Sequence, residues 1–150
     1  MDCDGVLTDG RLYFSAKGEE MKVFDVRDGQ GISSWHKAGF KSGIISGRGA
    51  QQIIQVRADE LGIEFVRSSS KDKLRDCKEI IASLGIEPER VAFIGDDIGD
   101  IGVMEYVGFA VAVGDAVKQV KSAASYVTKA NGGRGAVREV IDLLLPGNRK

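Results

Sequence analysis

The sequence predicts an α/β fold: a doubly wound, mostly parallel sheet with a β-hairpin insertion and no cap domain. Short apolar runs alternate with amphipathic stretches, which is the pattern of a parallel sheet with helices on both faces. Residues 91–94 have no polar alternation, as expected of a strand covered on both sides. The 150 residues, 43% hydrophobic and 29% charged, suit one domain spanning residues 1–150.

The hairpin is predicted near the start of the chain, and helices and strands then alternate. Two β-rich runs lie on either side of a turn containing Gly18, so residues 11–26 are expected to form the hairpin. Apolar spacing predicts helices over residues 31–38, 50–61 and 74–84, through Met104 and Val107, and over 117–124 and 137–144. Strands are predicted at 41–46, 63–66, 91–94, 109–113 and 126–128. A glycine loop opens the C-terminal segment 131–145.

Composition excludes several classes of function. The 21 basic and 22 acidic residues give a net charge of −1, so no nucleic-acid partner is expected. The sequence has no apolar run of about 18 residues and no signal-peptide pattern, which predicts no membrane span and a cytoplasmic location. Cys3 and Cys77 are too few for a disulfide framework, and with His36 as the only histidine they cannot form a Cys/His zinc site.

Polar side chains follow the apolar strands at the edge where a doubly wound sheet binds ligands. They are Asp2, Asp4, Ser46, Lys73, Asp96, Asp97 and Asp100. Strand alternation is expected to point Asp2 and Asp4 to one side while Cys3 turns into the core. Carboxylates gathered in this way repel one another without a cation, and oxygen ligands suit Mg²⁺. Only Met1 precedes the acidic pair, so either the first strand is cut short there or the natural protein has residues upstream.

Two of these residues supply the groups that bind phosphate. Ser46 brings a hydroxyl and a backbone N–H near a helix start, and Lys73 brings a point charge. Together with the carboxylates, they predict phosphoryl transfer to an aspartate.

Four segments resemble the motifs of the haloacid dehalogenase superfamily of phosphatases. They are residues 2–10, Ser46 within 44–48, Lys73, and residues 95–100. Within that superfamily the chain resembles the small capless phosphatases that act on 3-deoxy-D-manno-octulosonate 8-phosphate, on segments 26–29, 126–128 and 132–138 as well. The resemblance implies a Rossmann-like core and a Mg²⁺-dependent phosphomonoesterase that helps to make a lipopolysaccharide sugar.

The resemblance also implies a role for each acidic residue. Asp2 would attack phosphorus and become an aspartyl phosphate, and Asp4 would protonate the leaving oxygen and later activate water. The Asp2 carboxylate, the Asp4 main-chain carbonyl and the Asp96 carboxylate would hold Mg²⁺. Asp100 would lie close by, acting either through water or by orienting the motif-three lysine.

Phosphate and substrate contacts follow from the same resemblance. Ser46, Gly47 and Lys73 would bind the transferring oxygens, and Lys71 is a competing assignment that the distance to residues 95–97 disfavours. Arg48 is a candidate for the substrate carboxylate, because a guanidinium matches a carboxylate bidentately. Arg134 would also contact substrate.

The resemblance implies a homotetramer in which the C-terminal segment lies near a neighbouring active site. Without a cap, substrate selection would come from the hairpin and from this segment. His36 and Trp35 are expected to pack or to lie at the surface.

Three other functions are weighed against this one. The same chemistry on a nine-carbon 2-keto-3-deoxy acid 9-phosphate is the nearest. In a receiver-type phosphoacceptor domain the acceptor aspartate follows the third strand and an acidic pair precedes it. Here the Asp2–Asp4 pair comes first and the acidic loop comes late, so this function is disfavoured. A noncatalytic oligomerisation module of the same fold is disfavoured by the retained Asp2, Asp4, Ser46, Lys73 and Asp96.

Overall fold

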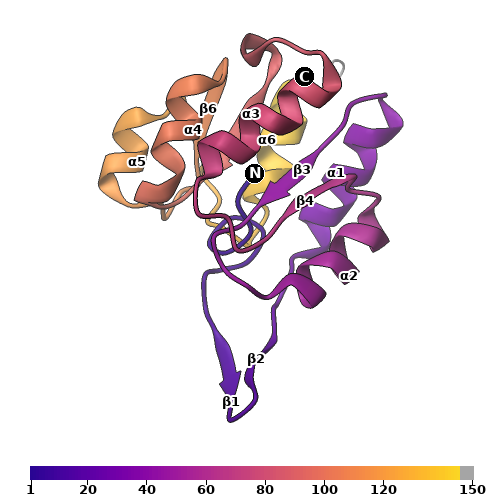
Figure 1. The fold of residues 1–150 in the computed structure, drawn as a ribbon. Coiled ribbons are helices and arrows are strands. Elements are labelled where there is room, and N and C mark those ends of the chain that lie inside the picture. The colour runs from indigo at the N-terminus through magenta and orange to yellow at the C-terminus, as the bar shows by residue number, and fades with distance from the viewer. Residues whose placement is uncertain (146–150) are drawn as a thin grey trace.

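A parallel sheet forms the centre of the computed structural model, which describes residues 1–145 (Figure 1). Strand β3 (Gly43–Ile45) pairs with β4 (Phe65–Arg67), and β6 (Phe109–Ala112) pairs with both β5 (Ala92–Gly95) and β7 (Tyr126–Val127), always in parallel. The start of the chain joins the two groups: Ile45 N donates to Met1 O and Asp2 N donates to Ile94 O, each at 3.0 Å. The strand order is therefore β4, β3, residues 1–2, β5, β6, β7.

Helices cover both faces of this sheet (Figure 1). On one face α1 (Val26–Lys37) packs against α2 (Gln51–Leu61) and α6 (Ala136–Leu144). On the other, α4 (Ile101–Tyr106) packs between α3 (Lys73–Leu84) and α5 (Lys118–Ala123). Two short 3₁₀ helices, η1 (Pro88–Arg90) and η2 (Ile98–Asp100), flank β5. The order of strands reverses direction between residues 1–2 and β5, and this reversal is where such sheets bind ligands.

The hairpin consists of β1 (Tyr13–Ser15) and β2 (Gly18–Met21), which pair antiparallel and project from the body (Figure 1). Within residues 1–145 no cap domain covers the carboxyl ends of the strands. The predicted fold class is confirmed. None of the helices described is long and apolar enough to cross a bilayer.

The hydrophobic core lies on both sides of the sheet. Phe93, Val111 and Ile44 from the strands are at most 2% exposed, and Val137 from α6 is 1% exposed. Burying a side chain of this size stabilises the fold by about 1.5–3 kcal/mol. Cys3 is fully buried among them, as its sequence position predicted.

Helix α1 begins five residues earlier than predicted, and the second hairpin strand ends at Met21 instead of reaching residue 26. Asp25 caps the helix, because its side chain accepts a hydrogen bond from Arg27 N at 2.7 Å. Gly29 lies inside the helix, where a Cβ would be 2.5 Å from Arg57 Nη2. The glycine thus allows close packing of α1 on α2, although the predicted helix began only at residue 31.

Candidate active site

Asp2 lies where the start of the chain, residues 1–2, leaves its place between β3 and β5, and Lys73 is directly beside it. The Asp2 side chain is nearly buried; its Oδ1 accepts from Cys3 N at 2.7 Å and its Oδ2 is 2.8 Å from Lys73 Nζ. Lys73 is the first residue of α3, whose N-cap is Asp72. The ammonium also donates to Asp100 Oδ1 at 2.7 Å. Burial lowers the pKa of Lys73, but Asp2 and Asp100 outweigh it, so the pKa is raised and the lysine is charged.

Asp100 ties the loop after β5 to this lysine. Its carboxylate is completely buried, and Oδ2 accepts from Asp96 N at 3.0 Å and from Asp97 N at 3.3 Å. A Cβ at Gly95 would lie 2.6 Å from the Asp100 Cβ, so glycine there lets the loop fold back over the end of the strand. Of the two expected ways for Asp100 to act, the contacts favour orienting Lys73.

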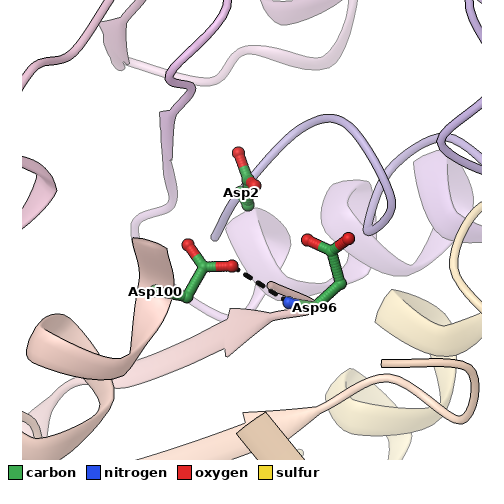
Figure 2. Close-up of side chains that lie close together, drawn as sticks. All are labelled: Asp2, Asp96 and Asp100. Carbon is green, nitrogen blue, oxygen red and sulfur yellow. Dashed lines mark hydrogen bonds between the residues drawn. The ribbon is translucent and has the colours of Figure 1, made fainter. Parts of the chain in front are cut away.

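Asp2, Asp96 and Asp100 form a carboxylate cluster (Figure 2). One oxygen from each lies within 4.8 Å of the others. Burial, together with the charges of Asp2 and Asp100, raises the pKa of Asp96 to about 8. Burial and the charge of Asp100 also raise the pKa of Asp2. Repulsion of this kind is what a bound cation relieves.

A divalent cation fits this cluster. Asp96 Oδ1 is buried and, among the described residues, has no hydrogen-bond partner. A buried acceptor without a donor is costly unless another group supplies positive charge. All three carboxylates offer hard oxygen ligands, which suit Mg²⁺. Asp96 also lies against the backbone at Gly5, where a Cβ would be 2.0 Å from Oδ2.

Asp4 has partners different from those of the cluster. Residues 3–8 form a turn, because Val6 N, Leu7 N and Thr8 N all donate to Cys3 O. The strand alternation used to pair Asp4 with Asp2 therefore does not apply, and Asp4 is not part of the carboxylate cluster. The Asp4 carboxylate instead contacts Lys22 Nζ and accepts from Ser46 Oγ at 3.5 Å.

Ser46 lies at the end of β3 with 1% of its surface exposed. Its Oγ accepts from Arg48 N at 3.3 Å. Its backbone N–H donates to Arg67 O at 2.7 Å, so this amide serves the sheet and the predicted use of it for phosphate is wrong. Gly47 lines a pocket of about 540 Å³ together with Lys73.

Lys71 lines the same pocket but is exposed. Lys73, in contrast, pairs with Asp2 and Asp100. The structure therefore favours Lys73 as the motif-three lysine, since it is the one beside Asp2.

The base of the hairpin adds two residues that the sequence did not single out, Lys22 and Glu19. The Lys22 side chain is fully buried, and its Nζ is 2.7 Å from Glu19 Oε1 as well as in contact with Asp4. Burial lowers the pKa of Lys22, but the hydrogen bonds to Asp4 and Glu19 outweigh it, so the pKa is raised. Glu19 Oε2 is 3.2 Å from Arg48 Nη2. Only the path of the hairpin reveals this network, because a lysine in a β-rich run has no distinctive spacing.

The glycine loop at 132–135 lies against the turn that carries Asp4. Gly133 N donates to Val6 O at 2.9 Å, and a Cβ at Gly132 would be 1.7 Å from Gly5 O. The side chain of Arg134 is largely exposed, and its Nη2 lies 3.7 Å from Asp9 Oδ2 of the same chain. The loop therefore packs against the first motif of its own chain.

His36 and Trp35 have structural partners. His36 Nε2 is 2.8 Å from Ser42 Oγ, and Trp35 stacks on Phe40. A cavity of about 610 Å³ beside them, lined mostly by apolar side chains, contains none of the predicted site residues. The expectation that these two residues pack is confirmed.

Comparisons with known proteins agree with this geometry. Residues 63–141 match the family model of haloacid dehalogenase-like hydrolases. The chain is 47% identical over 144 residues to the 3-deoxy-D-manno-octulosonate 8-phosphate phosphatase of Yersinia pestis, covering 96% of this chain and 76% of that protein.

Two solved structures show the same fold. One is the 3-deoxy-D-manno-octulosonate 8-phosphate phosphatase of Moraxella catarrhalis in complex with magnesium, phosphate and KDO, with a TM-score of 0.90, 37% identity and coverage of 95% of this chain and 81% of that one. The other is the cobalt-bound phosphatase of Haemophilus influenzae, with a TM-score of 0.92, 39% identity and coverage of 95% and 82%. The chain belongs to the haloacid dehalogenase-like hydrolase family.

Proposed function

We propose that the protein is a Mg²⁺-dependent phosphomonoesterase that hydrolyses 3-deoxy-D-manno-octulosonate 8-phosphate to the free sugar acid and phosphate, a step in lipopolysaccharide sugar synthesis. The observation that carries the proposal is the cluster in which Lys73 Nζ lies within 2.8 Å of both Asp2 and Asp100, at the point where the sheet reverses direction. This arrangement joins a nucleophile, a fixed positive charge and a cation site in one place.

Asp2 is the proposed nucleophile. Its Oδ2 would attack phosphorus in line and form an aspartyl phosphate, which divides hydrolysis into two easier steps. Lys73, held by Asp100, would neutralise the transferring oxygens, and the Ser46 hydroxyl and Gly47 would position them. The short Lys73–Asp100 hydrogen bond supports this role, because it keeps the ammonium in place before substrate arrives.

Asp4 is the proposed general acid and base. It would protonate the leaving alcohol oxygen during the first step and take a proton from water during the second. Its position on the turn after Asp2, outside the carboxylate cluster, supports a role separate from attack.

Mg²⁺ is proposed at the carboxylates of Asp2 and Asp96 and at the main-chain carbonyl of Asp4, with Asp100 adjacent. The unpartnered Asp96 Oδ1 supports this assignment. The ion would supply charge neutralisation between the nucleophile and the phosphoryl oxygens.

The substrate class follows from similarity and from charge. Relatives that are 37–47% identical across most of the chain carry the name of this phosphatase. Arg48 lies at the rim next to Ser46 and is 41% exposed at its side chain, so it can reach a substrate carboxylate. We propose Arg48 and Arg134 as substrate contacts.

A screen of phosphate release over sugar-acid phosphates, with and without Mg²⁺, tests the function. We expect Mg²⁺-dependent turnover, with the eight-carbon acid 8-phosphate as the preferred substrate. Preference for the nine-carbon acid 9-phosphate would reassign the substrate but keep the chemistry. No turnover of any ester with Mg²⁺ would favour the noncatalytic module.

Self-association through the hairpin is part of the proposal. Leu12, Phe14, Met21 and Val23 on or beside the hairpin are 44–63% exposed, although they are apolar. Large apolar side chains grouped on a projecting arm are typical of an interface. We propose a homotetramer, although the glycine loop of each C-terminal segment packs against the first motif of its own chain; light scattering on the purified protein tests the subunit number. The free, buried thiols of Cys3 and Cys77 support the proposed location in the reducing cytoplasm.

A further inference from the structure

Lys22 is the most completely buried cation at the edge of the proposed site. Its side chain has no exposed surface, whereas that of Lys73 is 13% exposed. Burying an ammonium is costly unless carboxylates surround it. Lys22 has two, Asp4 and Glu19, with side chains 14% and 7% exposed. A lysine buried in this way contributes nothing to solubility, and an apolar side chain would fill the same space at a lower free-energy cost. The buried contacts of Lys22 therefore indicate a further role.

The hairpin holds the lysine in a defined place. Glu19 lies within β2 and Lys22 directly follows that strand, so the Lys22–Glu19 hydrogen bond of 2.7 Å closes within one short segment. Glu19 is also paired with Arg48, in the loop that follows β3. The ammonium is therefore anchored from the hairpin, and its contact with Asp4 joins the hairpin to the turn after Asp2.

Asp4 depends on this contact more than on its other partner. The Ser46 hydroxyl reaches Asp4 Oδ2 only at 3.5 Å, which is a weak hydrogen bond. The contact with Lys22 is charge-assisted and is made by the other carboxylate oxygen. An aspartate side chain that must meet a leaving oxygen gains from having one oxygen fixed, because rotation about its side-chain bonds would misplace the proton.

We propose that Lys22 is a positioning residue, which holds one oxygen of Asp4 so that the other faces the leaving group, and that Glu19 holds Lys22 for this task. The inference rests on the proposed acid role of Asp4. The competing explanation is that Lys22 only fastens the hairpin to the body of the protein. The two differ in one measurable respect: only positioning of the acid makes the effect depend on the leaving group.

The test compares an alkyl ester with an aryl ester on the full chain with Mg²⁺. The quantity is kcat/KM, which reports the steps up to phosphoryl transfer to Asp2 and leaves out hydrolysis of the intermediate. We expect Lys22→Met to lower kcat/KM on the alkyl sugar-acid phosphate by about tenfold to a hundredfold. On an aryl phosphate, whose leaving group needs little protonation, we expect a change of less than about threefold. Lys22→Arg, which retains a charged donor, should recover part of the alkyl activity.

Lys41→Met is the matched control. Lys41 also forms a lysine–glutamate pair, with its Nζ 2.6 Å from Glu64 Oε2, but both side chains are more than half exposed. Both residues precede their strands, β3 and β4, whereas the predicted site residues follow strands. Lys41→Met should leave kcat/KM unchanged on both esters. Equal losses of Lys22→Met on both esters, or no loss on either, would overturn the positioning role.

A double variant separates failure of this inference from failure of the proposed function. If Lys22 acts through Asp4, adding Lys22→Met to Asp4→Asn should lower alkyl kcat/KM by no more than about twofold further. A full additional loss would overturn the inference while leaving the acid role of Asp4 intact. If Asp4→Asn itself affects both esters equally, the acid role is wrong and the inference falls with it. Glu19→Gln, which retains the shape of the side chain, should reproduce the alkyl-selective loss to a smaller degree.

Discussion

The carboxylate cluster and the hairpin differ in how their polar residues are held. In the cluster, Asp2, Asp96 and Asp100 are carried by chain segments that leave adjacent strands of one parallel sheet. In the described part of the chain, the two hairpin strands pair only with each other, and the side chains of Phe14 and Met21 are 63% and 49% exposed. Yet its base places the fully buried side chain of Lys22 against Asp4.

This difference separates two ways to build a site. At the sheet edge, the fold itself brings the carboxyl ends of strands together, so any chain with that strand order gathers the same positions. At the hairpin, the position of Lys22 depends on where the arm crosses the edge. We therefore expect changes in the cluster to lower the turnover of every ester. Changes in the hairpin should affect either the preference between alkyl and aryl esters or the assembly of subunits.

Asp2→Asn is expected to have the largest effect. Removing the proposed nucleophile should lower kcat by at least about 10³-fold on every ester, because the phosphoryl group would lose its proposed acceptor. Steady-state phosphate release checks this, and rapid quenching should show no aspartyl phosphate. Asp59→Asn on α2 is the control for loss of one exposed carboxylate. Substantial turnover by Asp2→Asn would remove it as the nucleophile.

Lys73→Met should lower kcat by about 10²–10³-fold, as expected when one fixed charge at the transferring group is lost. Lys71→Met is the matched comparison, since Lys71 lines the same pocket but is exposed. It should remain within about threefold of the unchanged protein. The reverse order of the two variants would show that Lys71 is the motif-three lysine.

The stability of the metal-free protein should fall as pH rises. Burial and the neighbouring carboxylates raise the pKa of Asp96 from 3.8 to about 8. Between those values the folded protein therefore holds a proton that the unfolded chain has released, and folding is favoured at the acidic end. From pH 5 to 8 we expect the free energy of unfolding to fall by at least about 1 kcal/mol more than in Asp96→Asn.

Urea unfolding at each pH, in chelator and then in Mg²⁺, measures this slope. Mg²⁺ should reduce it, because the ion stabilises the ionised carboxylates. An unchanged or rising stability of the metal-free protein across this range, relative to Asp96→Asn, would contradict the assigned environment.

Phe14→Ser and Met21→Ser should have the smallest effect on the folded chain. Both side chains are exposed, so the free energy of unfolding of the single subunit should change by less than about 0.5 kcal/mol. The proposed oligomer should nevertheless dissociate, which light scattering measures as a lower mass. Val56→Ser on α2, 70% exposed in the described chain, is the control. An unchanged mass would exclude these side chains from the interface.

The sequence by itself determined the fold class, because apolar strands and amphipathic helices alternate with the periods of a doubly wound sheet. It also placed Asp2, Ser46, Lys73, Asp96 and Asp100 after their strands. That prediction was possible because a strand ends where an apolar run gives way to polar residues, and this change can be read directly in the sequence. The start of α1 was misplaced at residue 31, whereas the helix begins at Val26 and holds both Gly29 and Gly31 in close packing.

Only the tertiary structure decided the partners of these residues. Spacing along the chain already favoured Lys73 over Lys71, but the contact of Lys73 with Asp2 depends on how α3 docks. The separation of Asp4 from the carboxylate cluster depends on the turn over residues 3–8. Lys22 and Glu19 meet Asp4 and Arg48 across 18 and 29 residues of sequence. Contacts of that range arise from the packing of whole elements, and no local spacing in the chain encodes them.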